Sequence, residues 1–392
     1  MTQIRNRAAI ERAGWRAGED FTALDSEAIA RPLSNFGHWL KARTGLGWTT
    51  GIALNAFSYY YFEHLAWQRF GGDIAAGKYD VVHRLTPLTP TTPSLLARRC
   101  RQVGVPFVWG PINGGVPWPP GYTDVLRAEG EWLSYFRSGM KLMPFYRSTR
   151  RDAAAIIVGS QATWDELADY HDKCVYIPEN GVDSDHFTTR AQPASGEKLR
   201  VAFVGRLVPY KGADILIEAA APLIRSERIE LDIIGDGPQM PQLRAIVARE
   251  GVGNGVKLDG WQEHGNLAGR LSQSQVFAFP SIREFGGGVV LEAMALGLVP
   301  VVVNYAGPGE LVTDWTGFRV KMGKRAELVR SFQDTLGNLW EQRGTLSEIG
   351  GRARERVLES FTWKAKAAQI VEVYKWALGR QATKPDFGRP FR

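Results

Sequence analysis

The sequence predicts an α/β protein made of two Rossmann-like domains, each with a parallel sheet. Short apolar runs of strand length alternate with helical patterns in both halves of the chain. In the first half these runs are residues 80–83, 106–109 and 155–158, and in the second half they include 199–204, 231–234, 276–279 and 298–303. Such alternation is typical of a parallel sheet covered by helices. Ligands of these sheets bind outside the carboxyl ends of the strands, which here is the cleft between the domains.

The chain divides into two domains and a closing segment. We expect a first domain over residues 1–190, a second over 191–362, and a closing segment over 363–392. Residues 191–198 are small and polar, as in a linker, and residues 363–379 have the pattern of a long helix, followed by a basic tail. The length of 392 residues fits two or three domains, and the 44% hydrophobic content is enough to form their cores.

Cysteine content and the amino-terminal residues bear on the compartment. Two cysteines, Cys100 and Cys174, cannot form a disulfide framework and fit a reducing environment. Residues 1–12 have no apolar core of the kind found in a secretory signal, and no apolar stretch is long enough to span a bilayer. We therefore expect a cytoplasmic protein, with peripheral attachment to the inner face of the cell membrane as an open alternative.

The net charge of +7 and the isoelectric point of about 9.3 raise the question of an anionic partner. Signatures of nucleic-acid recognition are lacking, so we expect no nucleic-acid partner. The basic excess favours attraction to an anionic membrane surface, although an ordinary basic surface explains it equally well. Candidate membrane contacts are Arg98, Arg99 and Arg101, residues 141–151, and residues 384–392. The aromatic-rich helical run 48–70 fits either core packing or burial among lipid headgroups.

Two carboxylates flank a glycine run in the second half. Glu284 and Glu292 enclose Phe-Gly-Gly-Gly-Val-Val-Leu, which lies between the strand 276–279 and a helical pattern. A glycine-rich turn from strand to helix directs backbone amides and the positive end of the helix dipole at one point, which suits a phosphate. Carboxylates on either side of it suit sugar and ribose hydroxyls, with which they form charge-assisted hydrogen bonds.

Two further strand-to-helix turns precede this motif. Arg206 and Lys211 follow the strand 199–204, with Gly205 and Gly212 beside them, and two cations so placed can close on a diphosphate. Gly235, Asp236 and Gly237 follow the next strand, and Pro238 suits the first position of a helix. For each of these turns taken alone, the alternative is an ordinary surface loop that binds no ligand.

Taken together, these motifs resemble the donor-nucleotide domain of glycosyltransferase family 4, whose members are retaining enzymes of the GT-B fold. The resemblance extends over residues 176–363 and includes the hinge-like Ile-Pro-Glu-Asn-Gly-Val-Asp at 177–183. It implies that Arg206 and Lys211 bind the diphosphate and stabilise it as the leaving group. It also implies that Glu284 contacts the donor sugar and Glu292 the ribose hydroxyls. Further donor-binding positions, several of them supplying backbone amides, would be Gly205, Gly235, Asp236, Gly237, Gly287, Gly288, Val289 and Val290.

The resemblance implies a nucleotide-diphosphate sugar as co-substrate and no other cofactor. Breaking a sugar–phosphate bond builds negative charge on the diphosphate, which fixed cations stabilise. Arg206 and Lys211 would make a metal unnecessary. Asp183 and Asp185 have the spacing of a metal-binding Asp-x-Asp run, but in this hinge-like segment they fit turn residues better. We therefore expect no metal site.

The first domain departs from the family pattern. Family members begin with a strand and a glycine-rich loop, whereas residues 5–11 have the pattern of a helix start, so we expect the first strand to be missing. Either upstream residues precede this start, or the domain is shortened and its activity is impaired. Acceptor or sugar contacts must come from this domain, and the candidates are His83, Asn113 and Gly114, at or after strand ends. The alternative is that Asn113 and Gly114 form a simple tight turn and that His83 has a structural role. The resemblance implies a retaining reaction of the front-face kind, which needs no enzymatic base.

The expected function is retaining hexosyl transfer to an acceptor, with a lipid-linked saccharide favoured over a soluble metabolite. A non-catalytic nucleotide-sugar-binding protein of the same fold is the main alternative. A dehydrogenase fits less well, because Met240 stands where the third glycine of its fingerprint would be. A sugar phosphorylase of similar fold would carry a pyridoxal lysine pocket, which the sequence does not indicate.

Overall fold

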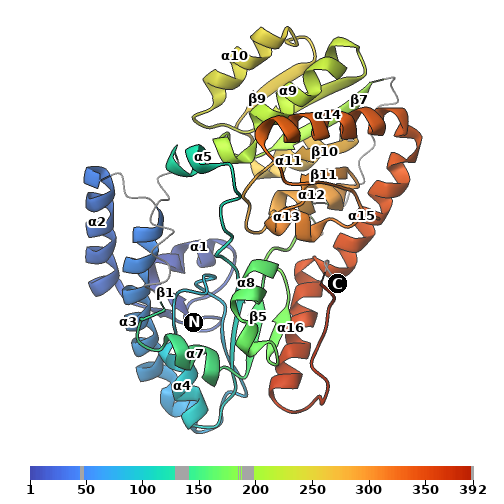
Figure 1. Ribbon diagram of the computed structural model, residues 1–392. Coiled ribbons are helices and arrows are strands. Elements are labelled where there is room, and N and C mark those ends of the chain that lie inside the picture. Colours follow the sequence, from blue (N-terminus) through green and yellow to red (C-terminus); the bar gives the residue numbers. More distant parts are fainter. Residues whose placement is uncertain (45–47, 129–140, 184, 186, 188–197, 390–392) are drawn as a thin grey trace.

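The computed structural model consists of two facing α/β domains, as the sequence predicts (Figure 1). It describes residues 1–44, 48–128, 141–183, 185, 187 and 198–389. The predicted linker at 191–198 lies outside the described residues except for Lys198. The chain passes between the domains at 177–183 and again at 361–363, and these two segments pair with each other. The amide of Val182 donates to the carbonyl of Phe361 (2.9 Å) and that of Trp363 to the carbonyl of Val182 (3.2 Å).

The second domain has a six-stranded parallel sheet in the order β12-β11-β10-β7-β8-β9. Counted from β7, this is the Rossmann order 3-2-1-4-5-6, in which the direction of winding reverses between the first and fourth strands. That reversal lies between β7 and β10. The strands are β7 (Leu199–Val204), β8 (Ile229–Ile234), β9 (Val256–Gly260), β10 (Val276–Phe279), β11 (Val299–Val303) and β12 (Phe318–Val320).

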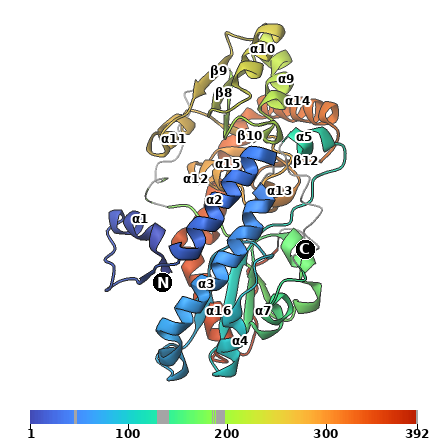
Figure 2. The same ribbon diagram turned by 90° about the vertical axis from the view of Figure 1, so that its left-hand side faces the viewer.

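Helices flank this sheet on both sides (Figure 2). One group brings α9 together with α10 and α14, and the other brings α12 together with α11, α13 and α15. The helices are α9 (Ala213–Arg225), α10 (Met240–Glu250), α11 (His264–Leu271), α12 (Gly288–Leu296), α13 (Ala306–Leu311), α14 (Arg325–Glu341) and α15 (Leu346–Ser360). Pro238 does not begin a helix, because α10 starts two residues later and Pro241 occupies its first turn.

The first domain has a four-stranded parallel sheet in the order β3-β4-β5-β6. Alternate residues of its strands point to opposite faces, as the strand period of two requires. Phe107 and Trp109 of β4 pack beneath α3, α4 and α8, whereas Val108 packs with Val373 of α16. The elements are β3 (Val82–Arg84), β4 (Phe107–Ile112), β5 (Ala155–Val158), β6 (Cys174–Tyr176), α3 (Trp48–Ala75), α4 (Leu95–Gln102), α8 (Gln161–Glu166) and α16 (Trp363–Ala377).

The first 24 residues stay outside this sheet. Thr2 and Gln3 (β1) pair with Ala23 and Leu24 (β2) in a separate two-stranded sheet, with the short helix α1 (Arg7–Arg12) between them. The expected helix start near residue 5 is therefore confirmed, and no strand precedes β3 in the four-stranded sheet of the described residues.

A long helical hairpin of α2 (Glu27–Thr44) and α3 lies along the first domain (Figure 2). In the described part of α3 the aromatic run packs inward: Phe62 is buried, and Trp67 and Phe70 pack against the core of the domain. The side chain of Phe57 lies outside the described residues. Among the helices that the structure describes, none is both long enough and apolar enough to cross a membrane.

A buried ion pair joins α3 to β3. The side chains of Glu63 and Arg84 are 1% and 3% exposed, with Arg84 Nη1 3.4 Å from Glu63 Oε1. Arg84 also donates to the carbonyls of Thr92 and Pro93, at 2.7 and 2.9 Å. Glu63 accepts from Ser94 Oγ and from the amide of Leu95, both at 2.7 Å, so it caps the start of α4. This network ties two helices to the edge of the sheet.

Replacing Arg84 with methionine should destabilise the protein strongly, because it leaves the Glu63 carboxylate buried without its cation. The expected loss is about 3–5 kcal/mol, the usual cost of breaking a buried pair on one side, read from denaturant unfolding followed by circular dichroism. The matched control is Arg7→Met, which breaks the exposed Arg7–Glu11 pair (2.9 Å) and should change stability by less than about 1 kcal/mol. Equal losses of stability in Arg84→Met and Arg7→Met would contradict the assignment of Glu63 and Arg84 as a stabilising buried ion pair.

Candidate active site

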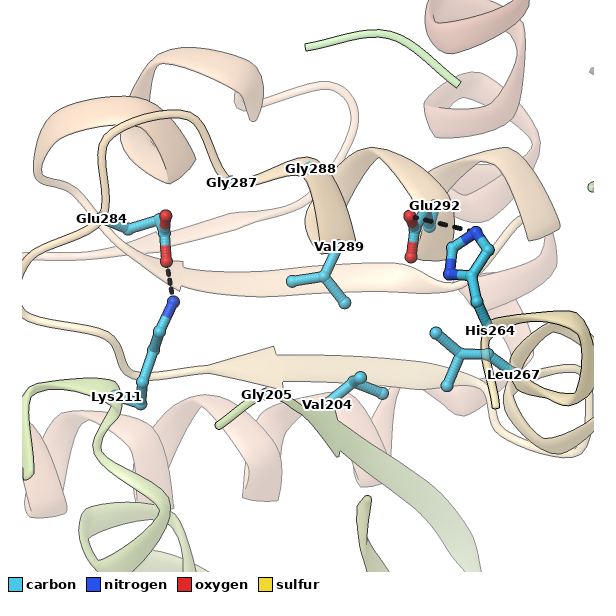
Figure 3. Close-up of a pocket in the computed structure, with 10 residues that line it drawn as sticks. All are labelled: Val204, Gly205, Lys211, His264, Leu267, Glu284, Gly287, Gly288, Val289 and Glu292. Atoms are coloured by element: carbon cyan, nitrogen blue, oxygen red, sulfur yellow. Dashed lines mark hydrogen bonds and ion pairs between the residues drawn. The ribbon is translucent and has the colours of Figure 1, made fainter. Parts of the chain in front are cut away.

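A pocket lies at the winding reversal of the second sheet, between the carboxyl ends of β7 and β10 (Figure 3). Neighbouring parallel strands whose connections leave in opposite directions open a crevice at this place. The cavity measures about 350 Å³, which lies within the range for small-molecule sites. Its lining residues are Val204, Gly205, Lys211, His264, Leu267, Glu284, Gly287, Gly288, Val289 and Glu292.

The glycine run forms the loop that leads into α12. Gly287 has φ of 68°, a left-handed conformation that favours glycine, and α12 begins at Gly288. Val289 lines the pocket within the first turn of the helix. The start of α12 therefore directs its backbone amides and positive dipole end at the cavity, which suits an anionic group.

Val290 lies in the first turn of α12, next to Val289. Its side chain is fully buried in the core of the domain, and its amide donates to the carbonyl of Gly287 at 2.9 Å. Because that donor is already used inside the helix turn, Val290 contributes packing under the pocket. The helix period carries each successive residue about 100° around the axis, so Val289 and Val290 face different surroundings.

Lys211 and Glu284 form an ion pair at one end of the pocket. Their side chains are 16% and 20% exposed, and an ion pair that is largely withdrawn from water is weakly screened. Lys211 ends a short 3-10 turn and precedes Gly212, whose φ is 74°. A Cβ at Gly212 would lie 2.5 Å from the carbonyl oxygen of Pro280, so glycine is required for the turn to approach β10.

Glu292 and His264 lie at the other end of the pocket. His264 Nε2 is 3.9 Å from Glu292 Oε1, and the imidazole is 64% exposed. Burial raises the pKa of the Glu292 carboxyl, and His264 opposes that shift. His264 is the first residue of α11, and nothing in the sequence around this isolated histidine marks it as a site residue. It comes to the pocket only because the sheet reverses its winding there.

Four expected donor-binding or catalytic residues lie near the pocket without lining it. Arg206 is exposed on the loop after β7. Gly235, Asp236 and Gly237 follow β8, where Asp236 Oδ1 accepts from the amide of Gly237 at 2.7 Å. A Cβ on Gly235 would overlap the carbonyl oxygen of Gly205, so these glycines let the two loops touch.

His83 does not reach the pocket. Its Nδ1 lies 2.6 Å from the hydroxyl of Tyr374 on α16, and its Nε2 lies 2.6 Å from the carbonyl oxygen of Gly110. Burial lowers the pKa of the imidazole to about 4, so the ring is neutral near pH 7. With both nitrogens engaged, His83 joins the closing helix to the sheet.

Asn113 lies between the two domains. Its Nδ2 donates to Glu179 Oε1 at 2.7 Å and to the carbonyl of Phe285 at 3.1 Å. Phe285 follows Glu284, so this first-domain residue touches the pocket loop directly. Gly114 stays with its own domain, since its carbonyl accepts from Thr163 Oγ1 at 3.2 Å.

The basic segments expected to meet a membrane contain both residues engaged within the protein and exposed residues. Arg150 is buried and donates to the carbonyls of Tyr146 and Pro90, at 3.0 and 2.9 Å. Arg101 and Arg151 both pair with Asp152, at 2.6 and 2.8 Å. In the tail, Lys384 donates to the carbonyl of His171 at 2.7 Å, and Arg389 Cζ lies 3.9 Å from the ring centre of Trp164. Arg98, Arg101, Lys141, Arg147 and Arg151 remain exposed.

The Asp-x-Asp run behaves as a turn. Asp183 Oδ1 accepts from the amide of Asp185 at 3.0 Å, the pattern of an Asx turn. Across the part of the chain that the structure describes, no three His, Cys, Asp or Glu side chains gather as a metal site would require.

Comparison with known proteins by sequence identifies a family, and comparison by structure identifies a fold. The family model described as "Glycosyl transferases group 1" matches residues 185–352. The "GDP-mannose-dependent alpha-(1-6)-phosphatidylinositol monomannoside mannosyltransferase" of Mycobacterium tuberculosis is 30% identical over 303 residues, covering 71% of this chain and 72% of that protein. The "MMP alpha-(1->4)-mannosyltransferase" of Mycolicibacterium hassiacum is 28% identical over 240 residues, which cover 60% of this chain and 57% of that protein.

Two solved structures show the likeness in fold. HepE of Anabaena, in complex with UDP, superimposes with a TM-score of 0.58 at 20% identity, over 78% of this chain and 81% of that one. A glycosyltransferase of Rickettsia africae superimposes with a TM-score of 0.58 at 16% identity, over 92% and 97% of the two chains. The two facing Rossmann-like domains are thus those of the GT-B fold. With its sequence similarity to the mannosyltransferase and its match to the family model, the chain belongs to the group 1 glycosyl transferases.

Proposed function

We propose that this chain transfers a hexosyl group from a nucleoside-diphosphate sugar to a saccharide or lipid-linked acceptor, with retention of the anomeric configuration, as in glycosyltransferase family 4. The observation that carries the proposal is the pocket between β7 and β10. There a cation, two carboxylates and the start of α12 line one cavity. Each of these groups matches one chemical part of a nucleotide sugar.

The diphosphate would lie against Lys211 and the start of α12. As the sugar–phosphate bond breaks, negative charge grows on the departing diphosphate, and a cation fixed nearby lowers the barrier. Lys211 is held in place by its pairing with Glu284 and lies 5.1 Å from the ring centre of Phe279. Arg206, on the same loop, is proposed as the second cation.

The two carboxylates would bind the two sugar rings of the donor. Glu284 at the Lys211 end is proposed to contact the transferred sugar, and Glu292 at the His264 end to bind the ribose hydroxyls. An ionised carboxylate accepts charge-assisted hydrogen bonds from hydroxyl groups, which fixes the orientation of a ring. Nucleotide and sugar would then lie on either side of the diphosphate.

A lipid-linked acceptor of surface polysaccharide or glycolipid synthesis, reached from the inner face of the cell membrane, is proposed for two reasons. The name of the M. tuberculosis relative specifies a phosphatidylinositol monomannoside. The first domain also exposes apolar side chains on its surface, among them Phe36 and Trp39 of α2, which are each 51% exposed and have ring centres 5.8 Å apart. Aromatic side chains of this kind suit the interface of a bilayer.

The central test is a thermal-shift screen of the chain against UDP-, GDP- and ADP-sugars, since a ligand of the native state raises its stability by mass action. One nucleotide should raise the melting temperature selectively. Lys211→Ala should then lower turnover with that donor about 100-fold, the usual cost of losing one transition-state donor. The control Lys257→Ala removes a cation from the exposed side of β9, where its side chain is 68% exposed, and should keep normal turnover. Equal activity of both variants would overturn the role of Lys211.

Nucleotide affinity should fall on acidification, because the ionised form of Glu292 is the stronger acceptor for ribose hydroxyls. Burial raises the pKa of this carboxyl, so the fall should begin above the ordinary glutamate value of about 4.3. A native-state pKa above the unfolded value means that protonation of Glu292 favours the folded protein. Acid unfolding caused by protonation of Glu292 therefore does not explain the expected loss of nucleotide affinity. Calorimetric titration should show weaker binding and a flatter pH dependence in Glu292→Gln, and an unchanged profile would contradict the ribose role.

Sugar transfer should not depend on a divalent metal, because Lys211 and Arg206 are proposed to neutralise the leaving group. Initial rates should be the same after treatment with EDTA as with added magnesium. Loss of activity with EDTA, restored by magnesium, would show that the cations of the chain are insufficient.

A further inference from the structure

One segment of the first domain lies on the second domain. We call residues 113–126, which follow β4, the strap. Tyr122 of the strap is 6% exposed and packs into the core cluster of the second domain, where its hydroxyl donates to the carbonyl of Gly323 at 2.9 Å. The hydroxyl of Tyr305 in turn donates to the carbonyl of Pro117 at 2.7 Å. Helix α5 (Thr123–Ala128), which begins in the strap, accordingly lies beside the second domain in Figure 1.

The middle of the strap contacts the residues next to both members of the Lys211–Glu284 pair. Arg283 precedes Glu284, and its Cζ lies 4.6 Å from the ring centre of Trp118. Trp118 also meets the ring of Tyr210, the neighbour of Lys211, edge-on with centres 6.4 Å apart. Contacts of this kind are worth up to about 1 kcal/mol each where water has partial access.

The start of the strap contacts the pocket loop itself. Asn113 is 7% exposed, and its Nδ2 bridges Glu179 of the hinge-like segment and the carbonyl of Phe285. The backbone of Asn113 is fixed as well, because its amide donates to the carbonyl of Leu88 at 2.7 Å. Because both the side chain and the backbone of Asn113 are hydrogen-bonded, Asn113 restrains the loop at Phe285, the residue after Glu284.

The loop has a particular need for such restraint. Three glycines, residues 286–288, follow Phe285, and glycine gives a chain the greatest conformational freedom of any residue. A carboxylate that binds a sugar must nevertheless keep its geometry within a fraction of an ångström. Contacts from outside the loop can supply the order that its own sequence lacks.

We propose that the strap positions the sugar-binding loop 283–288, with Asn113 as its central positioning residue. The proposal deepens the proposed function and rests on it for the identity of the ligand. Recognition of the donor is then divided: the second domain alone binds the nucleotide, whereas binding of the transferred sugar through Glu284 depends on the first domain. Asn113 acts through Phe285 and the loop, and it takes no part in bond breaking.

Hydrogen–deuterium exchange of the ligand-free protein tests the positioning directly. In Asn113→Ala the amides of residues 284–288 should exchange about fivefold faster, the factor expected from losing one hydrogen bond. Tyr122→Phe removes only the hydroxyl that bonds to Gly323 and should accelerate the same amides in the same direction. The matched control is Tyr60→Phe, which removes a tyrosine hydroxyl bonded to the carbonyl of Pro144 (2.6 Å) inside the first domain. Wild-type exchange of the loop in both strap variants would overturn the proposal.

Ligand binding separates positioning from general loss of structure. Asn113→Ala should keep the wild-type affinity for UDP and GDP within about twofold, but lower kcat/KM for UDP-glucose or GDP-mannose about fivefold, as loss of one hydrogen bond predicts. Equal losses for nucleotide and nucleotide sugar would mean a merely structural role and would overturn the proposal. Failure of the wild-type chain to bind any of the four probes would count against the proposed function, whereas the exchange experiment still decides the role of the strap.

Discussion

The adjacency of β7 and β10 in the second sheet is the constraint on which the site depends. These strands are far apart in sequence, yet Val201 pairs with Val276 and Ala202 with Phe277 in parallel register. The loops after the two strands therefore leave the sheet at the same edge, and Lys211 meets Glu284 there. Gly212 allows the loop after β7 to approach Pro280 at the end of β10 closely enough for this meeting. The ion pair, the start of α12 and the cavity follow from that one pairing of strands.

Much of the second domain could be predicted from its sequence, because its signals are local. Apolar runs mark β7, β10 and β11, and a glycine turn after a strand marks the start of α12. Lys211 and Glu284 lie on such turns and Glu292 lies in α12, about one helical turn from its start, so their shared pocket follows from the fold class. The sequence does not say which amides in a helix start are already bonded, as that of Val290 is to the carbonyl of Gly287. His264 was missed because it follows the weakly patterned strand β9, which the apolar runs did not indicate.

The first domain was harder to predict because tertiary contacts determine what its polar residues do. His83 ends a strand as a ligand-binding histidine would, but Tyr374, from the far end of the chain, occupies one of its nitrogens. Arg150 belongs to a basic run, yet it is withdrawn from the surface and bonded to backbone carbonyls. Such partners are distant in sequence and leave no local pattern. Asn113 was expected at the site from its place after β4, but its partners in the hinge-like segment and in the second domain were not.

The closing helix α16 also has a consequence for how the protein is made. Val108, Ala155 and Ile157 of the first sheet are buried against Val373 and its neighbours on α16. A chain growing from the ribosome can fold its earlier domain first only if that domain contains its own core. Among the described residues, α16 covers this face of the first sheet, and its residues 363–377 leave the exit tunnel only after the second domain. The nascent first domain therefore exposes this apolar sheet face to solvent while the second domain is being synthesised.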